Sequence, residues 1–192
     1  MAAKELKNIF LSASIPLPDR DPKYYGTADI IAIRDAVIAL ASVILPKYRI
    51  IWGGHPSITP LIYYVMEKLN VNIQEHLILF QSKFFEKYYL EDNNKFNNVI
   101  QTANLGDRDK SLALLRETML NSYEYSAGIF MGGMEGVETD FELFQELQPK
   151  ALTIPLASTG AATKLIFDRI DEKNENFLND FAYMSLFQKY LL

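Results

Sequence analysis

The sequence predicts an α/β domain of three layers, in which an open, mainly parallel sheet carries helices on both faces. Short apolar runs recur along the chain without alternating polar residues, which is typical of strands buried on both faces. Stretches with apolar residues at helical spacing separate these runs, and such alternation implies parallel strands joined by right-handed crossovers. The 192 residues suffice for one core, so we expect a single domain over 1–192.

The first half of the chain predicts three strands and two helices. Its apolar runs place the strands at 9–11, 49–52 and 77–80. Its amphipathic stretches place the helices at 28–43 and 57–69. Pro60 falls in the first turn of the second helix, where a proline is tolerated.

The second half continues the pattern. A brief apolar run at 99–100 and stronger runs at 128–131 and 152–156 predict further strands. The helices are expected at 108–121, with Asp107 as N-cap, through Phe141, Phe144 and Leu147, and at 163–170. A last helix at about 176–191 has an aromatic and methionine stripe, and we expect it to pack on the domain or on a partner.

Composition excludes several classes of function. The net charge of −5 works against a nucleic-acid partner, and cysteine is absent, which removes thiol nucleophiles and thiolate metal sites. His55 and His76 are the only histidines, which argues against a metal site. We expect no metal and no resident cofactor. No apolar run approaches the roughly 20 residues that span a bilayer. We therefore expect a cytoplasmic protein that does not engage a membrane.

The carboxyl ends of the predicted strands carry the candidate site. In an open parallel sheet the ligand lies beyond those ends, near the point where the strand order reverses. Glycine and small hydroxyl residues there let the backbone approach a ligand and aim N–H groups at anionic oxygens. Strand-to-helix turns need such residues anyway, but four on one edge favour a site of Rossmann-like type for a nucleotide-derived ligand. The ligand-binding candidates are Ser12, Ala13, Ser14, Gly53, Gly54, His55, Gly132, Gly133, Met134, Glu135, Gly136, Ser158 and Thr159.

The turn that begins at Gly132 and Gly133 is the most informative of the four. The carboxylates that follow it are Glu135, Glu138, Asp140 and Glu142. The helix dipole explains one or two of them. Four carboxylates together would repel a phosphate, so some of them should instead bind ribose hydroxyls or perform acid–base chemistry. We therefore assign this turn to the sugar, and the turn at 158–160 or a nearby arginine to phosphate.

Three blocks of the sequence resemble the SLOG superfamily. They are Ile9–Ser14, Trp52–Pro60 and Met131–Phe141. This superfamily includes the LOG-type phosphoribohydrolases, the DNA-processing protein DprA and sensor domains of bacterial defence. The chain is most similar, over roughly residues 8–168, to the cluster 3 branch, which belongs to nucleotide-signalling conflict systems. The resemblance implies a Rossmann-like fold, a nucleotide-type ligand and dimerisation.

The sequence departs from the catalytic pattern of the LOG enzymes, Pro-Gly-Gly-x-Gly-Thr-x-x-Glu. Met131 replaces the proline, one residue is inserted before Gly136, and Val137 stands at the threonine position. Asp140 falls at the position of the catalytic glutamate. The resemblance also makes Arg108 and Arg116 candidate counterparts of the arginines that LOG enzymes place near their ligand.

Two functions follow, with a third as a weaker alternative. The preferred one is a sensor or binding domain for an NAD- or ADP-ribose-like signal in a bacterial defence or stress system. It would act through a homo-oligomer, a dimer or larger, or through a separate effector protein. The alternative is an N-glycosidic hydrolase of nucleotides, with Asp140 or Glu138 as the catalytic carboxylate. The third is a structural protein without ligand binding.

Three further features have two interpretations each. His55 follows two glycines and serves either as a general base or as a turn-stabilising imidazole. Arg108 either reaches a phosphate or pairs with a neighbouring aspartate on a solvated face. Tyr24 and Tyr25 either stack on a base or pack a loop onto the domain.

Overall fold

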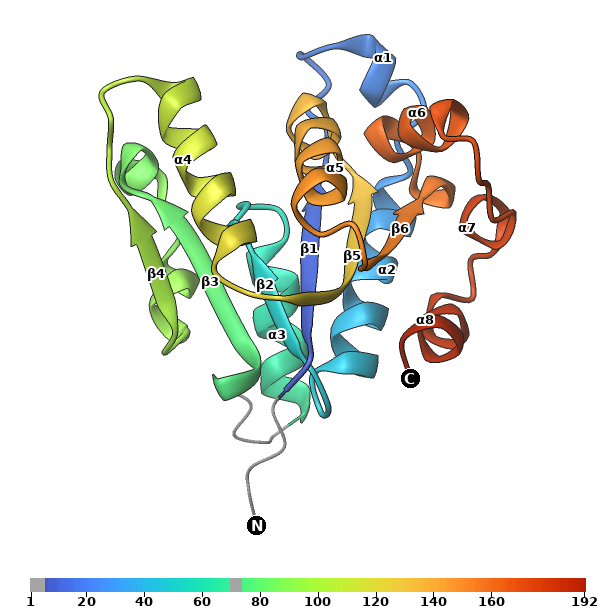
Figure 1. Cartoon of the computed structure of the whole chain (residues 1–192), viewed down its shortest axis with the longest axis horizontal. Coiled ribbons are helices and arrows are strands. Elements are labelled where there is room, and N and C mark those ends of the chain that lie inside the picture. Colours follow the sequence, from blue (N-terminus) through green and yellow to red (C-terminus); the bar gives the residue numbers. More distant parts are fainter. Residues whose placement is uncertain (1–5, 70–73) are drawn as a thin grey trace.

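A computed structural model describes residues 6–69 and 74–192 of the chain. Within these residues six strands form one sheet in the order β4-β3-β2-β1-β5-β6, and every neighbouring pair is parallel (Figure 1). The α/β fold with a parallel sheet is therefore confirmed. The strands are β1 (Asn8–Ser14), β2 (Arg49–Trp52), β3 (Leu77–Ser82), β4 (Val99–Thr102), β5 (Tyr125–Gly132) and β6 (Leu152–Leu156).

Helices cover both faces of the sheet, as expected. In Figure 1, α4 and α5 lie in front of the sheet, and α2 and α3 lie behind it. α8 packs on α2, on the rear side. The main helices are α2 (Ile30–Ile44), α3 (Thr59–Leu69), α4 (Arg108–Asn121), α5 (Glu135–Leu147), α6 (Ala161–Arg169) and α8 (Tyr183–Leu191). The short helices are α1 (Pro22–Tyr25) and α7 (Asn176–Asn179), with 3₁₀ turns at Gln74–His76, Lys83–Tyr88, Glu91–Lys95 and Ala157–Thr159.

The pleat of β1 divides the core in two. Ile9 and Leu11 point to the side of α2 and α3, whereas Phe10 points to the side of α4, α5 and α6. The ring of Phe10 stacks on Phe144 of α5, with the ring centroids 5.3 Å apart. Because both faces of β1 are buried, its sequence shows no polar alternation.

The strand order reverses at β1. From β1 the chain builds outward through β2, β3 and β4, and then returns to place β5 on the other side of β1. The carboxyl ends of the strands lie at the top of Figure 1, far from the amino terminus. The crevice beyond β1 is thus the position where folds of this kind hold a ligand.

The prediction of one helix at about 176–191 is wrong, because two helices, α7 and α8, occupy this segment. α7 ends at Asn179, and Asp180 is extended, with φ −95° and ψ 122°. The Asp180 carboxylate accepts a hydrogen bond from the backbone N–H of Ala182 at 2.7 Å, a local turn that competes with helix continuation. The aromatic spacing therefore belongs to two short helices.

No helix among the described residues combines the length and apolar character needed to cross a membrane.

Candidate functional site

A cavity of about 400 Å³ opens beyond the carboxyl ends of β1, β2 and β3. Its volume falls in the range of small-molecule sites, roughly 300–1,000 Å³. The first turns of α5 and one side of α4 form its other walls. Many of the predicted ligand-binding residues meet at this cavity: Ser12, Ala13, Ser14, Gly53, Gly54, His55, Arg108, Met134, Glu135, Gly136 and Asp140.

Gly132 and Gly133 do not line the cavity; both are buried. The Gly132 N–H donates to Thr159 Oγ1 at 2.8 Å, and the Gly133 N–H donates to the Ser14 carbonyl at 2.8 Å. Both glycines have positive φ, and a Cβ on Gly133 would meet Val137 at 2.1 Å. This turn therefore sets the direction of α5, and its N–H groups are already used within the protein.

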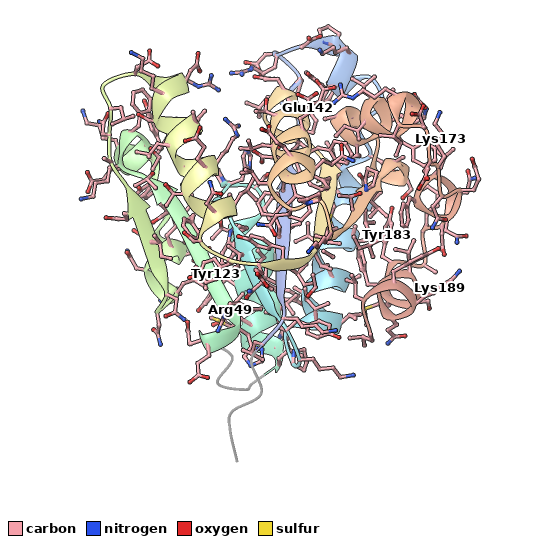
Figure 2. The ribbon with its side chains drawn as sticks, viewed as in Figure 1. Arg49, Tyr123, Glu142, Lys173, Tyr183 and Lys189 are labelled. Atoms are coloured by element: carbon pink, nitrogen blue, oxygen red, sulfur yellow. The ribbon has the colours of Figure 1, made fainter. Side chains whose placement is uncertain are left out.

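The turn at Ser158, Thr159 and Gly160, one of the two candidates for phosphate, also lies away from the cavity. Ser158 Oγ lies 3.2 Å from the hydroxyl of Tyr183, which Figure 2 places at the side of β6 and α8. Thr159 Oγ1 donates to the Leu156 carbonyl at 2.6 Å. The loop after α1 covers this turn, because Thr27 Oγ1 accepts from the backbone N–H of Ala161 at 2.9 Å. The hydroxyls of Ser158 and Thr159 therefore already have hydrogen-bond partners within the protein.

Glu138 likewise lies outside the cavity. Its carboxylate accepts from the hydroxyl of Tyr24 at 3.0 Å and pairs with Arg169 at 3.4 Å. Tyr24 is 1% exposed and packs in the core, so its position matches the packing interpretation rather than base stacking. Of the two candidate carboxylates, Asp140 alone borders the cavity.

Asp140 is held by two partners. Ser12 Oγ donates to Asp140 Oδ2 at 2.6 Å, and Arg116 Nε donates to Asp140 Oδ1 at 2.5 Å. The Asp140 and Arg116 side chains are only 17% and 18% exposed. Gly136 leaves space beside this pair, because a Cβ there would lie 3.3 Å from Arg116 Nη2, a tight contact. The absence of a side chain at Gly136 therefore gives space to Arg116, which approaches from α4.

Arg116 is the cation best placed to meet an anionic ligand. Among the described residues only its Nε has a hydrogen-bond partner, which leaves Nη1 and Nη2 as donors in a residue that lines the cavity. Arg108 also lines the cavity but pairs with Asp109 at 3.1 Å on an exposed face. Arg20, at the rim, pairs with Glu135 at 3.1 Å. Figure 2 shows Arg49 at the opposite, amino-terminal end of the sheet.

The beginning of α5 adds a second feature suited to anions. Met134 is its N-cap and gives no side-chain hydrogen bond to the helix. Met134, Glu135 and Gly136 all line the cavity. Uncapped N–H groups and the positive end of the helix dipole favour a bound anion. Together with Arg116 they form the part of the cavity wall that is best suited to an anion.

The far wall of the cavity comes from a region that the sequence did not mark as functional. Gln81 is the next-to-last residue of β3. Phe85 and Tyr88 follow in the first 3₁₀ segment, Tyr89 lies just after it, and Asn93 belongs to the second. Burial raises the pKa of Tyr89, so its hydroxyl stays protonated at neutral pH. The aromatic stretch and the asparagine-rich turn were visible in the sequence, but neither resembles a ligand motif.

His55 stabilises the turn after β2. The Ser57 backbone N–H donates to His55 Nδ1 at 3.2 Å, and the Ser57 hydroxyl lies 2.9 Å from the same nitrogen. A nitrogen that accepts from a backbone N–H is unprotonated, so the neutral ring suits this turn. Desolvation at the crowded cavity lowers the pKa of His55 from 6.5 to about 4, although the residue is still exposed.

We expect the stability of the ligand-free protein to fall as the pH drops from about 6.5 toward 4. Between these pH values His55 takes up a proton in the unfolded chain but stays neutral in the folded protein, so a lower pH favours unfolding. Above about pH 6.5 His55 is neutral in both states, and its effect on stability no longer changes with pH. Solvent contact makes the slope shallow. Urea unfolding at several pH values measures it. His55→Asn keeps an acceptor for the Ser57 N–H without titrating, and an equal slope in this variant would contradict the assignment.

Within the described residues no group of three or more histidine, cysteine or acidic side chains is arranged to hold a metal ion.

Comparison with known proteins places the chain in a family. No curated protein sequence matches it. The crystal structure of TM1055, a structural genomics target, shares its fold with a TM-score of 0.59 at 13% identity, over 90% of this chain and 89% of that one. The model of the SLOG cluster3 family matches residues 23–191, which include α4, α5 and most of the cavity walls. The chain therefore belongs to the SLOG cluster3 family.

Proposed function

We propose that this protein is a binding domain for a nucleotide-derived ligand, whose phosphate lies between Arg116 and the first turn of α5. The free guanidinium N–H groups of Arg116 carry the proposal, because they border the cavity beside an uncapped helix start. Of the two phosphate-binding elements expected from sequence, this arrangement favours the arginine over the turn at 158–160. The ribose then lies near Ser12 and Asp140.

The state of Asp140 favours binding over hydrolysis. An N-glycosidic hydrolase adds water to the anomeric carbon while the C–N bond breaks, and a carboxylate with a free oxygen assists that step. Both Asp140 oxygens accept hydrogen bonds from the protein, and one of the donors is an arginine. Such a carboxylate can still accept a ribose hydroxyl, because each oxygen has a second lone pair.

We expect AMP, NAD or cyclic ADP-ribose to raise the melting temperature without being consumed. A ligand at 100 times its Kd adds about 2.7 kcal/mol to the stability of the folded state, or roughly 5–10 °C for a chain of this size. Scanning fluorimetry measures the shift, and chromatography of the same mixtures measures product. A Lys173→Met variant removes a cation far from the cavity and should show the same shift.

Two outcomes would overturn the proposal. Release of free base or nicotinamide, lost in Asp140→Asn, would assign the protein to the hydrolases. The absence of any shift across a broad nucleotide panel would favour a structural role.

Membership of the SLOG cluster3 family supports a wider proposal, that the bound ligand is a signal in a bacterial defence or stress system. Binding would then be relayed by self-assembly or to an effector protein. Size-exclusion chromatography with light scattering, with and without the ligand that gives the thermal shift, tests the first route. An unchanged mass in both states would exclude self-assembly driven by the ligand.

A further inference from the structure

We infer that His55 offers the bound ligand an uncharged hydrogen-bond donor, the N–H at Nε2, and that Ser57 fixes the imidazole in that tautomer. The inference deepens the proposed function and rests on it, because it assigns one contact to the nucleotide in the same cavity. It stands on three hydrogen bonds that link His55, Ser57 and Ile15.

Two groups of Ser57 meet at His55 Nδ1. The Ser57 backbone N–H, which can only donate, lies 3.2 Å from Nδ1, so this nitrogen carries no proton. Ser57 Oγ lies 2.9 Å from the same nitrogen. Because a bare nitrogen can only accept, the Ser57 hydroxyl donates to it. The same Oγ accepts from the backbone N–H of Ile15 at 3.1 Å, which fixes the orientation of the hydroxyl.

The tautomer of His55 follows from these contacts. A neutral imidazole carries one proton, and when Nδ1 is an acceptor that proton is on Nε2. Desolvation keeps the ring neutral, because it lowers the pKa of His55 to about 4. At neutral pH the side chain therefore carries an N–H donor at Nε2 and no charge.

Nε2 is the ring nitrogen that a ligand can reach. His55 is exposed and lines the cavity. Its Nδ1 edge is held against the turn by Ser57, whereas Nε2 has no hydrogen-bond partner among the residues that the structure describes. The backbone is fixed as well, since the His55 carbonyl accepts from the N–H groups of Ile58 and Thr59, both at 3.0 Å. A donor held in this way loses little conformational freedom when a ligand binds.

The same arrangement removes His55 from general-base chemistry. A general base needs a ring nitrogen with an unused lone pair within reach of the proton that it takes. The lone pair of Nδ1 is used by Ser57, and Nε2 carries the proton. Of the two roles that the sequence allowed, the turn-stabilising one is therefore joined to ligand binding, and the role of a base is not.

The donor meets a part of the nucleotide other than the phosphate at α5. β1 lies between β2, which precedes His55, and β5, which precedes α5. Strands two positions apart in a sheet lie roughly 10 Å from each other. With the phosphate at the start of α5, the sugar or the base is the part that extends toward β2. Hydroxyl oxygens and bare ring nitrogens are both acceptors for an N–H group.

The test uses two substitutions that each keep one half of the imidazole. His55→Asn keeps an acceptor near Nδ1 and loses the donor, whereas His55→Gln places an N–H near Nε2 and loses the acceptor for Ser57. We expect His55→Asn to weaken AMP binding about threefold to tenfold in calorimetry, the effect of one lost hydrogen bond. His55→Gln should recover most of that affinity but unfold at a lower urea concentration than His55→Asn.

Two comparisons complete the calorimetry. His76→Asn is the matched control, because His76 bonds to the Tyr48 carbonyl at the amino-terminal end of the sheet, and AMP affinity should not change. Ribose 5-phosphate locates the acceptor. If His55→Asn weakens it as much as AMP, the acceptor is on the sugar, and if only AMP is weakened, the acceptor is on the base.

Nitrogen NMR of the protein labelled at its two histidines reads the tautomer directly. At pH 7 we expect His55 to be protonated at Nε2 and bare at Nδ1, with and without AMP. Ser57→Ala removes the hydroxyl that donates to Nδ1 and should populate the other tautomer as well. The His55→Asn spectrum identifies the remaining signals as those of His76.

Three outcomes would overturn the inference and leave the proposed function intact. They are a proton on Nδ1 of the wild type, an unchanged AMP affinity in His55→Asn, and equal losses of affinity in His55→Asn and His55→Gln, which would confine His55 to the turn. Release of free base that is lost in both variants would make His55 a catalytic base and overturn both proposals. Failure of AMP, NAD and cyclic ADP-ribose to bind the wild type would overturn the proposed function and this inference with it.

Discussion

Replacing Gly160 by alanine is expected to destabilise the fold by about 4 kcal/mol or more, a large part of the stability of a typical domain. Gly160 has a φ of +71° and a ψ of −157°, a region open essentially to glycine alone. A Cβ there would lie 1.8 Å from the Thr27 carbonyl oxygen and 3.1 Å from Ala28 Cα. Since these neighbours are backbone, rotating a side chain cannot relieve the overlap.

The loop that covers this turn would have to move away. Its displacement breaks the hydrogen bond from Ala161 N to Thr27 Oγ1 and the one from Asp29 N to the Thr159 carbonyl. Asp29 caps α2 through a 2.9 Å bond to Ala32 N, so the damage extends to a second helix. Urea unfolding at pH 7 measures the loss.

Gly106→Ala is the matched control. Gly106 has a φ of +74°, but nothing lies within 4 Å of a Cβ built there. This variant should lose only the roughly 1–2 kcal/mol of left-handed backbone strain. An equal loss of stability in both variants would mean that the contact between Gly160 and Thr27 does not hold the loop.

Local sequence was enough to predict the sheet and most of its helices. The apolar run at Arg49–Trp52 is β2 to the residue, because Gly53 ends it and the strand is buried on both faces. The predicted capping role of Asp107 is confirmed, since its side chain accepts from Lys110 N at 2.9 Å. The end of α7 was missed because the bond from Ala182 to Asp180 leaves no strong signal in the sequence.

The candidate site was predictable only in part. Ligands of open parallel sheets bind beyond the carboxyl ends of the strands, and this rule placed Ser12 and Gly53 at the cavity correctly. It succeeds because all parallel strands end at the same edge of the sheet. It could not show that Thr27 closes the turn at β6, a contact between residues 134 positions apart. Nor could it show that Gln81 and Asn93 line the same cavity, because the segment after β3 carries no recognisable ligand motif. Spacing along α4 likewise does not tell which of its arginines turns inward.

Replacing Arg116 by methionine is expected to weaken AMP binding about tenfold to a hundredfold, the loss that follows from removing hydrogen bonds to a charged group. It should also destabilise the ligand-free protein by about 2–4 kcal/mol, because Asp140 then keeps Ser12 as its only partner. We place the loss below that of a fully buried pair, since both side chains retain some solvent contact. Calorimetry and urea unfolding measure the two effects.

Arg108→Met is the control on the same helix. Its partner Asp109 is 85% exposed, so the loss of this ion pair should change stability by less than about 1 kcal/mol. AMP affinity should change by no more than about threefold. Equal losses of affinity in the two arginine variants would mean that Arg116 attracts the ligand only through its charge and makes no specific contact with it.

The double variant Arg116→Met with Asp140→Leu separates binding from folding. Removing both charges leaves no unpaired carboxylate, so part of the lost stability should return, although Ser12 still lacks its acceptor. AMP affinity should stay low, because methionine supplies no donor to the phosphate. Recovery of affinity together with stability would show that Arg116 acts only by supporting the fold, and the phosphate would then have to be assigned to the start of α5 alone. Low affinity in a restored fold would instead show that the charged pair itself, and not only the fold that it supports, contributes to binding.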